Sequence, residues 1–307
     1  MKTRLVTTVV ALGMSLAAGC RHSTVSRVPA MVEPEFTGPS ISVRLDANPA
    51  VSADVTYLSA HDESRTSFVK RQDSGGWREE HEWPLARTDW QKWYLHSNGD
   101  APTSHGDGML SVDAPGDEPP DRFDYDPDSP APTIGGNTCC WPEIVPWGPM
   151  DQRPVEERPD VLCYSSPPLE TDMEVTGPIT VTLYASSSAP DTDFTAKLVD
   201  VYPFGCAVNI VDGIVRARYR EGPTEPSPIE PGRVYEYRID LGPTANVFRR
   251  GHRIRLEVSS SNFPHYDRNP NTGHEFGRDA EVRVAEQTVL HSEAYCSHVV
   301  LPVMPAT

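Results

Sequence analysis

Residues 193–219 read DFTAKLVDVYPFGCAVNIVDGIVRARY, and this stretch decides the fold. Alternate residues from Phe194 to Leu198 are apolar, which is the period-two pattern of a strand with one buried face. Residues 202–205 supply turn chemistry, because proline presets φ and glycine accepts a positive φ. A second apolar run, 206–211, ends at Asp212-Gly213, after which the chain continues extended. The stretch predicts an antiparallel hairpin with a following strand, at the centre of an all-β sandwich.

Further short apolar runs recur around this hairpin, and turn residues separate them. We predict strands at 160–165, 175–183, 234–241, 254–258, 282–284, 287–290 and 298–303. The 31 prolines and 21 glycines among 307 residues favour short strands joined by turns over long helices. Residues 97–107 and 115–132 are predicted to be long exposed loops. Many short strands with regular turn signals fit a jelly roll or a related sandwich.

The charge of the chain is strongly acidic, with 44 Asp and Glu against 27 Lys and Arg and a formal net charge of −17. An acidic chain repels phosphate backbones, so nucleic acid is not expected as a partner. The hydrophobic content of 37% and the mean hydropathy of −0.46 fit a domain with its own core better than a helical membrane protein.

The N-terminus has the features of an export signal. Lys2 and Arg4 precede an apolar run, residues 5–16, that is too short to span a bilayer as a mature anchor. Ala17-Ala18-Gly19-Cys20 follows and resembles the bacterial lipobox, in which the cysteine thiol is lipidated and becomes the new N-terminus. An ordinary signal peptide, cut near Gly19, is the alternative.

The sequence divides the first 76 residues into two parts. Residues 1–20 are assigned to a lipoprotein signal peptide. Residues 21–76 are assigned to a tether and an unassigned segment, with weak strand signals at 41–45 and 54–58. The protein is then expected to be exported and anchored to the bacterial cell envelope through lipid on Cys20, on the periplasmic or the outer surface.

The cysteines give no metal or disulfide assignment. Five remain after Cys20, so at least one stays free, and vicinal Cys139-Cys140 does not bridge easily without strain. No C-x-x-C pair or His/Cys spacing indicates a zinc site. Cysteines on strands are expected to be buried thiols.

Two acidic segments invite comparison with calcium sites. The residues Asp267-x-Asn269-x-Asn271 resemble the start of a calcium loop, but Pro270 intrudes and Arg278 takes the place of the last glutamate ligand. A turn-rich loop is therefore predicted there. Asp191 and Asp193 flank the start of a strand, where a structural calcium is the less favoured alternative. No metal and no cofactor is assigned.

Several motifs occur in order between residues 77 and 305. They read WREE and EWPL (77–80, 82–85), GPMDQRP (148–154), DTDFTAKL (191–198), SSSNFP (259–264), and DRN and NTG (267–269, 271–273). Together they resemble the C-terminal jelly-roll domain of the X-Pro dipeptidyl-peptidase and cocaine-esterase-like (CocE/NonD) serine hydrolases. The resemblance implies a galactose-binding-like jelly-roll β-sandwich with long loops over residues 77–305. Family members carry this domain behind an α/β-hydrolase domain.

The resemblance does not supply a catalytic residue. The family's Ser-Asp-His triad lies in the α/β-hydrolase domain, where the serine occupies a tight G-x-S-x-G-like elbow. The sequence contains no such elbow, and residues 21–76 are too few for a domain of parallel strands and crossover helices. Ser259-Ser260-Ser261 ends a predicted strand and is interpreted as a hydrogen-bonding run. We assign no catalytic residue.

One loop is a candidate surface for a partner or a substrate pocket. It is Gly-led and apolar, and its candidate residues are Gly135, Gly136, Cys139, Cys140, Trp141 and Trp147. The resemblance implies that the equivalent loop looks toward the substrate pocket of the hydrolase domain. Cover by residues 21–76 is the equal alternative.

Three functions are consistent with these patterns. The favoured one is a membrane-tethered, non-catalytic sandwich that acts in binding or scaffolding. The second is a component of a serine hydrolase, a dipeptidyl-peptidase or an acyl esterase or amidase, whose catalytic domain is on another chain. The third is a carbohydrate-binding jelly roll, suggested by Trp77, Trp83, Trp90 and Trp93, although such aromatic residues usually pack onto a core. The corresponding ligands are a hydrolase domain, or a peptide, an ester or a glycan.

Overall fold

The computed structural model describes residues 40–41, 54–55, 57–58, 67–70, 77–138, 145–275, 277–278 and 280–305, and it divides the chain into two units, 1–86 and 87–307. In the first unit, β1 (Ser40–Ile41) pairs with β3 (Tyr57–Leu58). A second antiparallel sheet contains β2 (Asp54–Val55), β4 (Ser67–Lys70) and β5 (Trp77–Glu80).

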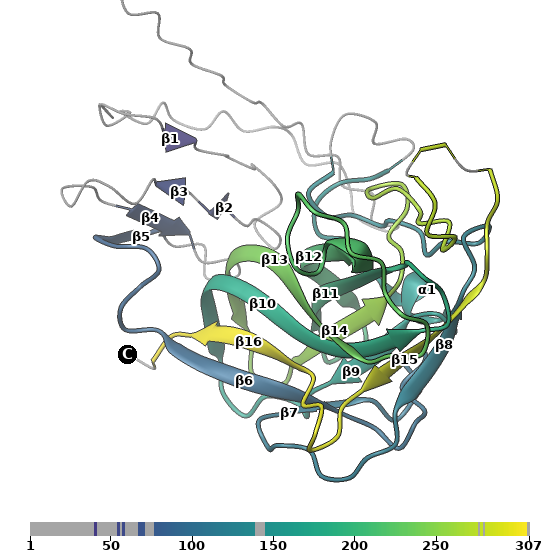
Figure 1. Cartoon of the computed structure of the whole chain (residues 1–307). Helices are drawn as coiled ribbons and strands as arrows, with labels where there is room; N and C mark the ends of the chain where they lie inside the picture. Colours follow the sequence, from purple (N-terminus) through teal and green to yellow (C-terminus); the bar gives the residue numbers. More distant parts are fainter. Residues whose placement is uncertain are drawn as a thin grey trace, which may run out of the picture. The chain divides into compact units, whose positions relative to one another are not determined.

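The second unit is an all-β sandwich, which confirms the predicted fold class (Figure 1). Its strands are β6 (Asp89–His96), β7 (Met109–Ser111), β8 (Asp121–Tyr125), β9 (Leu162–Ser165), β10 (Met173–Ser187), β11 (Asp193–Val201), β12 (Ala207–Arg216), β13 (Tyr235–Phe248), β14 (Arg253–Ser259), β15 (Ala285–Leu290) and β16 (His298–Val303). They are hydrogen-bonded in the order β12-β11-β14-β9-β7-β6-β16-β10-β15-β8, and β13 joins β10. The helical elements are α1 (Arg153–Glu156) and the 3-10 turn η1 (Ala217–Tyr219).

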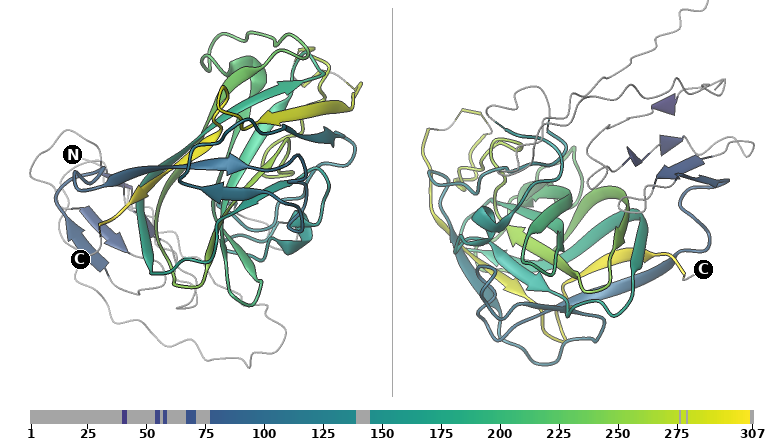
Figure 2. Two further views of the ribbon diagram at one scale, coloured as in Figure 1. Left: turned by 90° about the horizontal axis from the view of Figure 1, so that it is seen from below. Right: turned by 180° about the vertical axis from the view of Figure 1, so that it is seen from behind.

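The core lies between two layers of this continuous sheet (Figure 2). Leu198 on β11 and Leu256 on β14 belong to the same apolar cluster as Ile179 on β10. The rings of Phe194 on β11 and Tyr237 on β13, which are not neighbouring strands, lie 4.8 Å apart between centroids. Among the described residues no helix is long and apolar enough to cross a membrane.

The predicted hairpin forms, with one difference in its second strand. β11 and β12 pair antiparallel, and residues 202–205 make the turn, with Gly205 at φ 90°. The expected interruption at Asp212-Gly213 is wrong, because β12 runs through both residues and pairs them with Lys197 and Ala196. Gly213 is required there for a steric reason, since a Cβ would collide with the carbonyl oxygen of Asp240 on β13.

The prediction of a single buried face for β11 is also wrong, because all nine of its residues are buried. The inner face joins the core, as the alternation predicts. The outer face is covered by the segment that contains α1, whose Val155 packs with Ala131, Val161 and Cys163 in a second apolar cluster. This cover encloses polar side chains of the outer face, Lys197 among them.

The strand predicted at 298–303 forms with the predicted ends, and the others form with shifted ends, except 282–284, which is not a strand. The prediction that 115–132 is one exposed loop is wrong, because it contains β8. Asp121, Phe123 and Tyr125 of β8 point inward, and Arg122 and Asp124 are exposed. β8 is therefore the edge strand of the sheet and pairs with β15.

Candidate functional site

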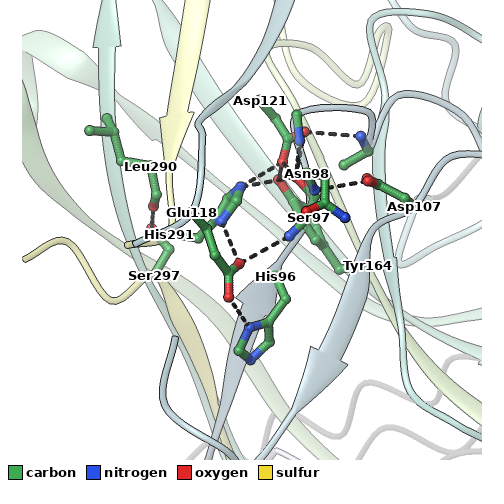
Figure 3. Close-up of polar contacts among 12 residues, drawn as sticks. His96, Ser97, Asn98, Asp107, Glu118, Asp121, Tyr164, Leu290, His291 and Ser297 are labelled. Atoms are coloured by element: carbon green, nitrogen blue, oxygen red, sulfur yellow. Dashed lines mark hydrogen bonds and ion pairs between the residues drawn. The ribbon is translucent and has the colours of Figure 1, made fainter. Parts of the chain in front are cut away.

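A serine, a histidine and two carboxylates meet in a buried network (Figure 3). Ser97 follows β6, Asp121 begins β8 and His291 follows β15. His291 Nε2 lies 3.1 Å from Ser97 Oγ and 2.8 Å from Asp121 Oδ2. His291 Nδ1 lies 3.2 Å from Glu118 Oε2, and Glu118 Oε1 lies 2.8 Å from His96. These residue types are those of a hydrolase triad, so their hydrogen bonds decide whether the serine can act as a nucleophile.

The hydrogen bonds direct the serine proton to a carboxylate instead. His291 has a carboxylate at each ring nitrogen, so both nitrogens donate, and the Ser97 hydroxyl donates to Asp121 at 2.8 Å. Tyr164 OH and the Ala101 amide donate to the same carboxylate. The side chains of His291 and Asp121 are fully buried. A nucleophile needs a base that takes its proton and access to a substrate, so this network ties strands together and does not form a triad.

His291 and Asp121 each favour the charged form of the other. Burial opposes the charge on His291, but the hydrogen bond and charge of Asp121, with the charge of Glu118, raise its pKa above the ordinary value. Burial likewise opposes the charge on Asp121. The donors His291, Ala101, Tyr164 and Ser97 outweigh it and hold the Asp121 pKa below the ordinary value.

The described base of the candidate loop lies close to β12, since a Cβ on Gly136 would approach Asp212. Gly136 and Gly148 exchange two backbone hydrogen bonds of 2.8 Å, which pins the base of the loop, and Trp147 beside them is half-buried. Gly135 and Gly136 have φ of 77° and 90°, a left-handed conformation that glycine adopts without strain. A Cβ on Gly136 would lie 3.1 Å from Asp212 Oδ1. The other candidates, Cys139, Cys140 and Trp141, lie outside the described residues, as does Cys20.

The GPMDQRP motif connects this loop to the sheet beneath. Gln152 is fully buried, donates to the carbonyl oxygens of Ile134 and Met150 at 2.7 and 3.0 Å, and accepts from Lys197 Nζ at 2.7 Å. Lys197 also lies 3.2 Å from Glu257 on the neighbouring strand. Burial raises the pKa of Glu257 to about 7, against the opposing charge of Lys197.

The SSSNFP motif packs beside the same segment. Ser259 Oγ donates to the Asp160 carbonyl, and Ser261 Oγ accepts from the Ala131 amide, both at 2.8 Å. Ser259 and Ser261 therefore make strand-end hydrogen bonds, as predicted, whereas the buried hydroxyl of Ser260 has no hydrogen-bond partner among the described residues. Asn262 Nδ2 donates to Asp212 at 3.1 Å. A cavity of about 20 Å³ remains between these residues, enough for about one water-sized group.

The acidic pair of the DTDFTAKL motif is neutralised by arginines. Arg216 donates to both oxygens of Asp193 at 2.9 and 3.0 Å, and Arg218 donates to Asp191 at 2.8 Å. Asn269 Nδ2 donates to both carboxylates, at 2.9 and 2.8 Å. Guanidinium groups thus occupy the place that a calcium ion would need. Among the described residues no group of three His, Cys, Asp or Glu side chains is arranged to hold a metal.

Sequence reasoning missed the network around His291 and the buried charges at Lys197. Glu118 and Asp121 are close in sequence, but Ser97 and His291 are distant from them, and no local spacing links the four residues. The signal that could have been used is a lone polar residue on an apolar strand face, as at Asp121 before Phe123 and Tyr125.

Comparison with known proteins gives the family. Residues 58–300 match the model of the X-Pro dipeptidyl-peptidase C-terminal non-catalytic domain. The chain is 48% identical over 230 residues to the cocaine esterase of Rhodococcus sp., which covers 74% of this chain and 40% of the esterase. The chain therefore spans about two fifths of the length of this relative.

Solved structures agree with this match. An aminopeptidase from a marine sediment Thaumarchaeota archaeon superimposes with a TM-score of 0.69 at 29% identity, over 78% of this chain and 40% of that chain. An α-amino acid ester hydrolase superimposes with a TM-score of 0.68 at 29% identity, over 77% of this chain and 40% of that chain. The similarity in each case covers a part of the hydrolase only. The chain belongs to the family of X-Pro dipeptidyl-peptidase C-terminal non-catalytic domains.

Proposed function

We propose that this chain is a non-catalytic β-sandwich module that binds a serine-hydrolase domain and is held at the cell envelope by lipid on Cys20. The observation that carries the proposal is the 48% identity to a cocaine esterase over only 40% of that enzyme. Such identity over one part of the esterase favours the view that this chain has kept the surface with which that part contacts the hydrolase part. In this reading the partner is the hydrolase domain, and an ester or a peptide is a substrate of the partner.

The geometry of the buried network supports the non-catalytic part of the proposal. Ser97, His291 and the carboxylates bring the right residue types together, but the serine proton is committed to Asp121 and the group is enclosed. Rearranging these bonds would unpair buried charges, which costs several kcal/mol. The module then contributes to hydrolysis by binding.

The candidate loop is the surface that we assign to the partner. The loop is pinned at Gly136 and Gly148 and held from below by Gln152, so Trp147 is presented on a rigid base. A rigid aromatic side chain is a common anchor in protein interfaces. A carbohydrate-binding role has less support, because Trp93 lies in the core, 8% exposed, and does not join Trp90 in an exposed row.

Co-purification tests this function. The exported chain is co-expressed with the remaining, hydrolase part of the Rhodococcus cocaine esterase, and the two are purified through a tag on one of them. We expect a 1:1 complex in gel filtration, and at least about tenfold weaker binding for Trp147→Ala. Trp90→Ala, an exposed tryptophan on β6, is the matched control. Separate elution of two folded proteins would contradict the proposal.

A further inference from the structure

Two buried oxygens, on residues that line the cavity between β11, β14 and the segment of α1, have no hydrogen-bond donor. They are Glu257 Oε1 and Asn262 Oδ1, and their residues are 4% and 6% exposed. Both residues line the cavity, together with Asp212. An unpaired buried acceptor is destabilising, so an occupant with several hydrogen-bond donors would stabilise this site.

Among the described residues, Asp212 is a carboxylate on the cavity lining that has no lysine or arginine partner. The two buried cations have carboxylate partners, since Lys197 pairs with Glu257 Oε2 at 3.2 Å and Arg255 pairs with Glu156. The described partners of Asp212 are Asn262 Nδ2 at 3.1 Å, the hydroxyl of Tyr266, and His265 Nε2 at 3.9 Å. A positively charged occupant would therefore balance the carboxylate of Asp212.

The size and walls of the cavity restrict the occupant further. The volume of about 20 Å³ admits about one group of the size of water. Ala131, Val155, Val161 and Ala196 line the cavity with apolar atoms, and Pro132 on its lining is exposed to solvent. A small group that carries N–H donors and is attached to an apolar chain fits both the volume and the apolar walls of this cavity.

We propose that the cavity binds a primary ammonium group, with Glu257 Oε1 and Asn262 Oδ1 as acceptors and Asp212 as the balancing charge. The N–H bonds of such a group can donate to both unpaired acceptors, and a metal ion fits less well because metals need a closer set of ligands. The ammonium belongs either to a small free amine or to the lysine side chain or N-terminus of a peptide. The inference does not depend on the proposed hydrolase partner.

The site is tested by thermal unfolding and titration calorimetry of residues 21–307, the part of the chain that remains after the predicted signal peptide. The probes are methylammonium chloride and a lysine-containing tripeptide with acetylated N-terminus, each compared with tetramethylammonium chloride at equal ionic strength. We expect a saturable rise in Tm with methylammonium and none with tetramethylammonium, which is larger and has no N–H donor. A response to the tripeptide as well assigns the site to a side chain, and a response to methylammonium alone assigns it to a free amine.

Three variants separate binding from stability. Glu257→Gln and Asp212→Asn keep the size of each side chain and should weaken methylammonium binding at least tenfold. Glu286→Gln, on the exposed side of β15, is the matched control and should bind as the parent chain does. The second charge variant keeps the test valid if the first does not fold. No saturable response to either amine, an equal response to tetramethylammonium, or unchanged binding in folded Asp212→Asn would overturn the proposal.

Discussion

His291 Nε2 lies 2.8 Å from Asp121 Oδ2, and this buried ion pair fastens the end of β15 to the start of β8. The two strands are already paired at Val289 and Asp121, so the side-chain contact repeats a backbone contact. The edge of the sandwich therefore depends on a charge pair enclosed in its own hydrogen-bond network.

Removing one member of this pair should destabilise the fold strongly. His291→Ala leaves the carboxylate of Asp121 buried without its cation, which costs about 3–5 kcal/mol. Urea unfolding followed by circular dichroism measures the loss. His105→Ala, an exposed histidine in the loop after β6, should change the free energy of unfolding by less than about 0.5 kcal/mol. Equal stability of the two variants would contradict this role for the network.

The network should also give the stability a defined pH dependence. The pKa of His291 is raised, so its contribution is present below its unfolded pKa of 6.5 and is lost as the pH rises through the folded value. The pKa of Asp121 is lowered, so its contribution is present above its unfolded pKa of 3.8 and is lost as the pH falls through the folded value. The difference in unfolding free energy between the parent chain and His291→Gln should therefore be largest between pH 3.8 and pH 6.5, the two unfolded pKa values. It should shrink as the pH rises through the folded pKa of His291. A difference that grows toward pH 9 would refute the assignment of charge to His291.

The close crossing of β12 and β13 gives a third prediction. Gly213→Ala places a methyl group against the Asp240 carbonyl, and we expect a loss of about 1–3 kcal/mol or more as in other overpacked sites. Gly116→Ala is the matched control, because nothing lies within 4 Å of a Cβ built there. The midpoints of thermal unfolding of both variants test this, and a neutral Gly213→Ala would show that the two strands are further apart.

The proposed lipid anchor gives a prediction in cells. Cys20→Ser removes the thiol that the lipobox pattern assigns to lipidation, so the protein should move from the membrane fraction to the soluble or unprocessed fraction. Cys296→Ser, whose thiol is half-buried in the sandwich, should stay with the membranes. Parallel behaviour of both variants would remove the support for a lipid anchor at Cys20.

The sequence predicts the inner half of the sandwich well. The alternation at Phe194, Ala196 and Leu198 places these residues in the core, and the Pro-Phe-Gly turn forms where expected. The alternation cannot show that the outer face of β11 is covered, because Lys197 is polar and its partners Gln152 and Glu257 are distant in sequence. Buried polar side chains that satisfy one another across strands look like surface residues in a single sequence.

The candidate site is only partly predictable for the same reason. The Gly-led loop attracts attention through Gly135 and Gly136, and the structure explains both glycines by their left-handed φ. Glu257 and Asn262 line the cavity, and a strand pattern and a motif supply them separately. The strand β8 is missed because Asp121 occupies an inward position that the period-two rule reserves for apolar residues.

The non-catalytic role of the chain is tested most directly with a fluorophosphonate serine probe. The probe is applied to the purified, folded chain, alone and mixed with the hydrolase part of the Rhodococcus cocaine esterase. Turnover of a short acyl ester and of an X-Pro chromogenic peptide is measured on the same samples. The account predicts that the chain alone is not labelled and turns over neither substrate, and that every labelled serine in the mixture belongs to the esterase part. Labelling of Ser97, or turnover by the chain alone that Ser97→Ala abolishes, would contradict it.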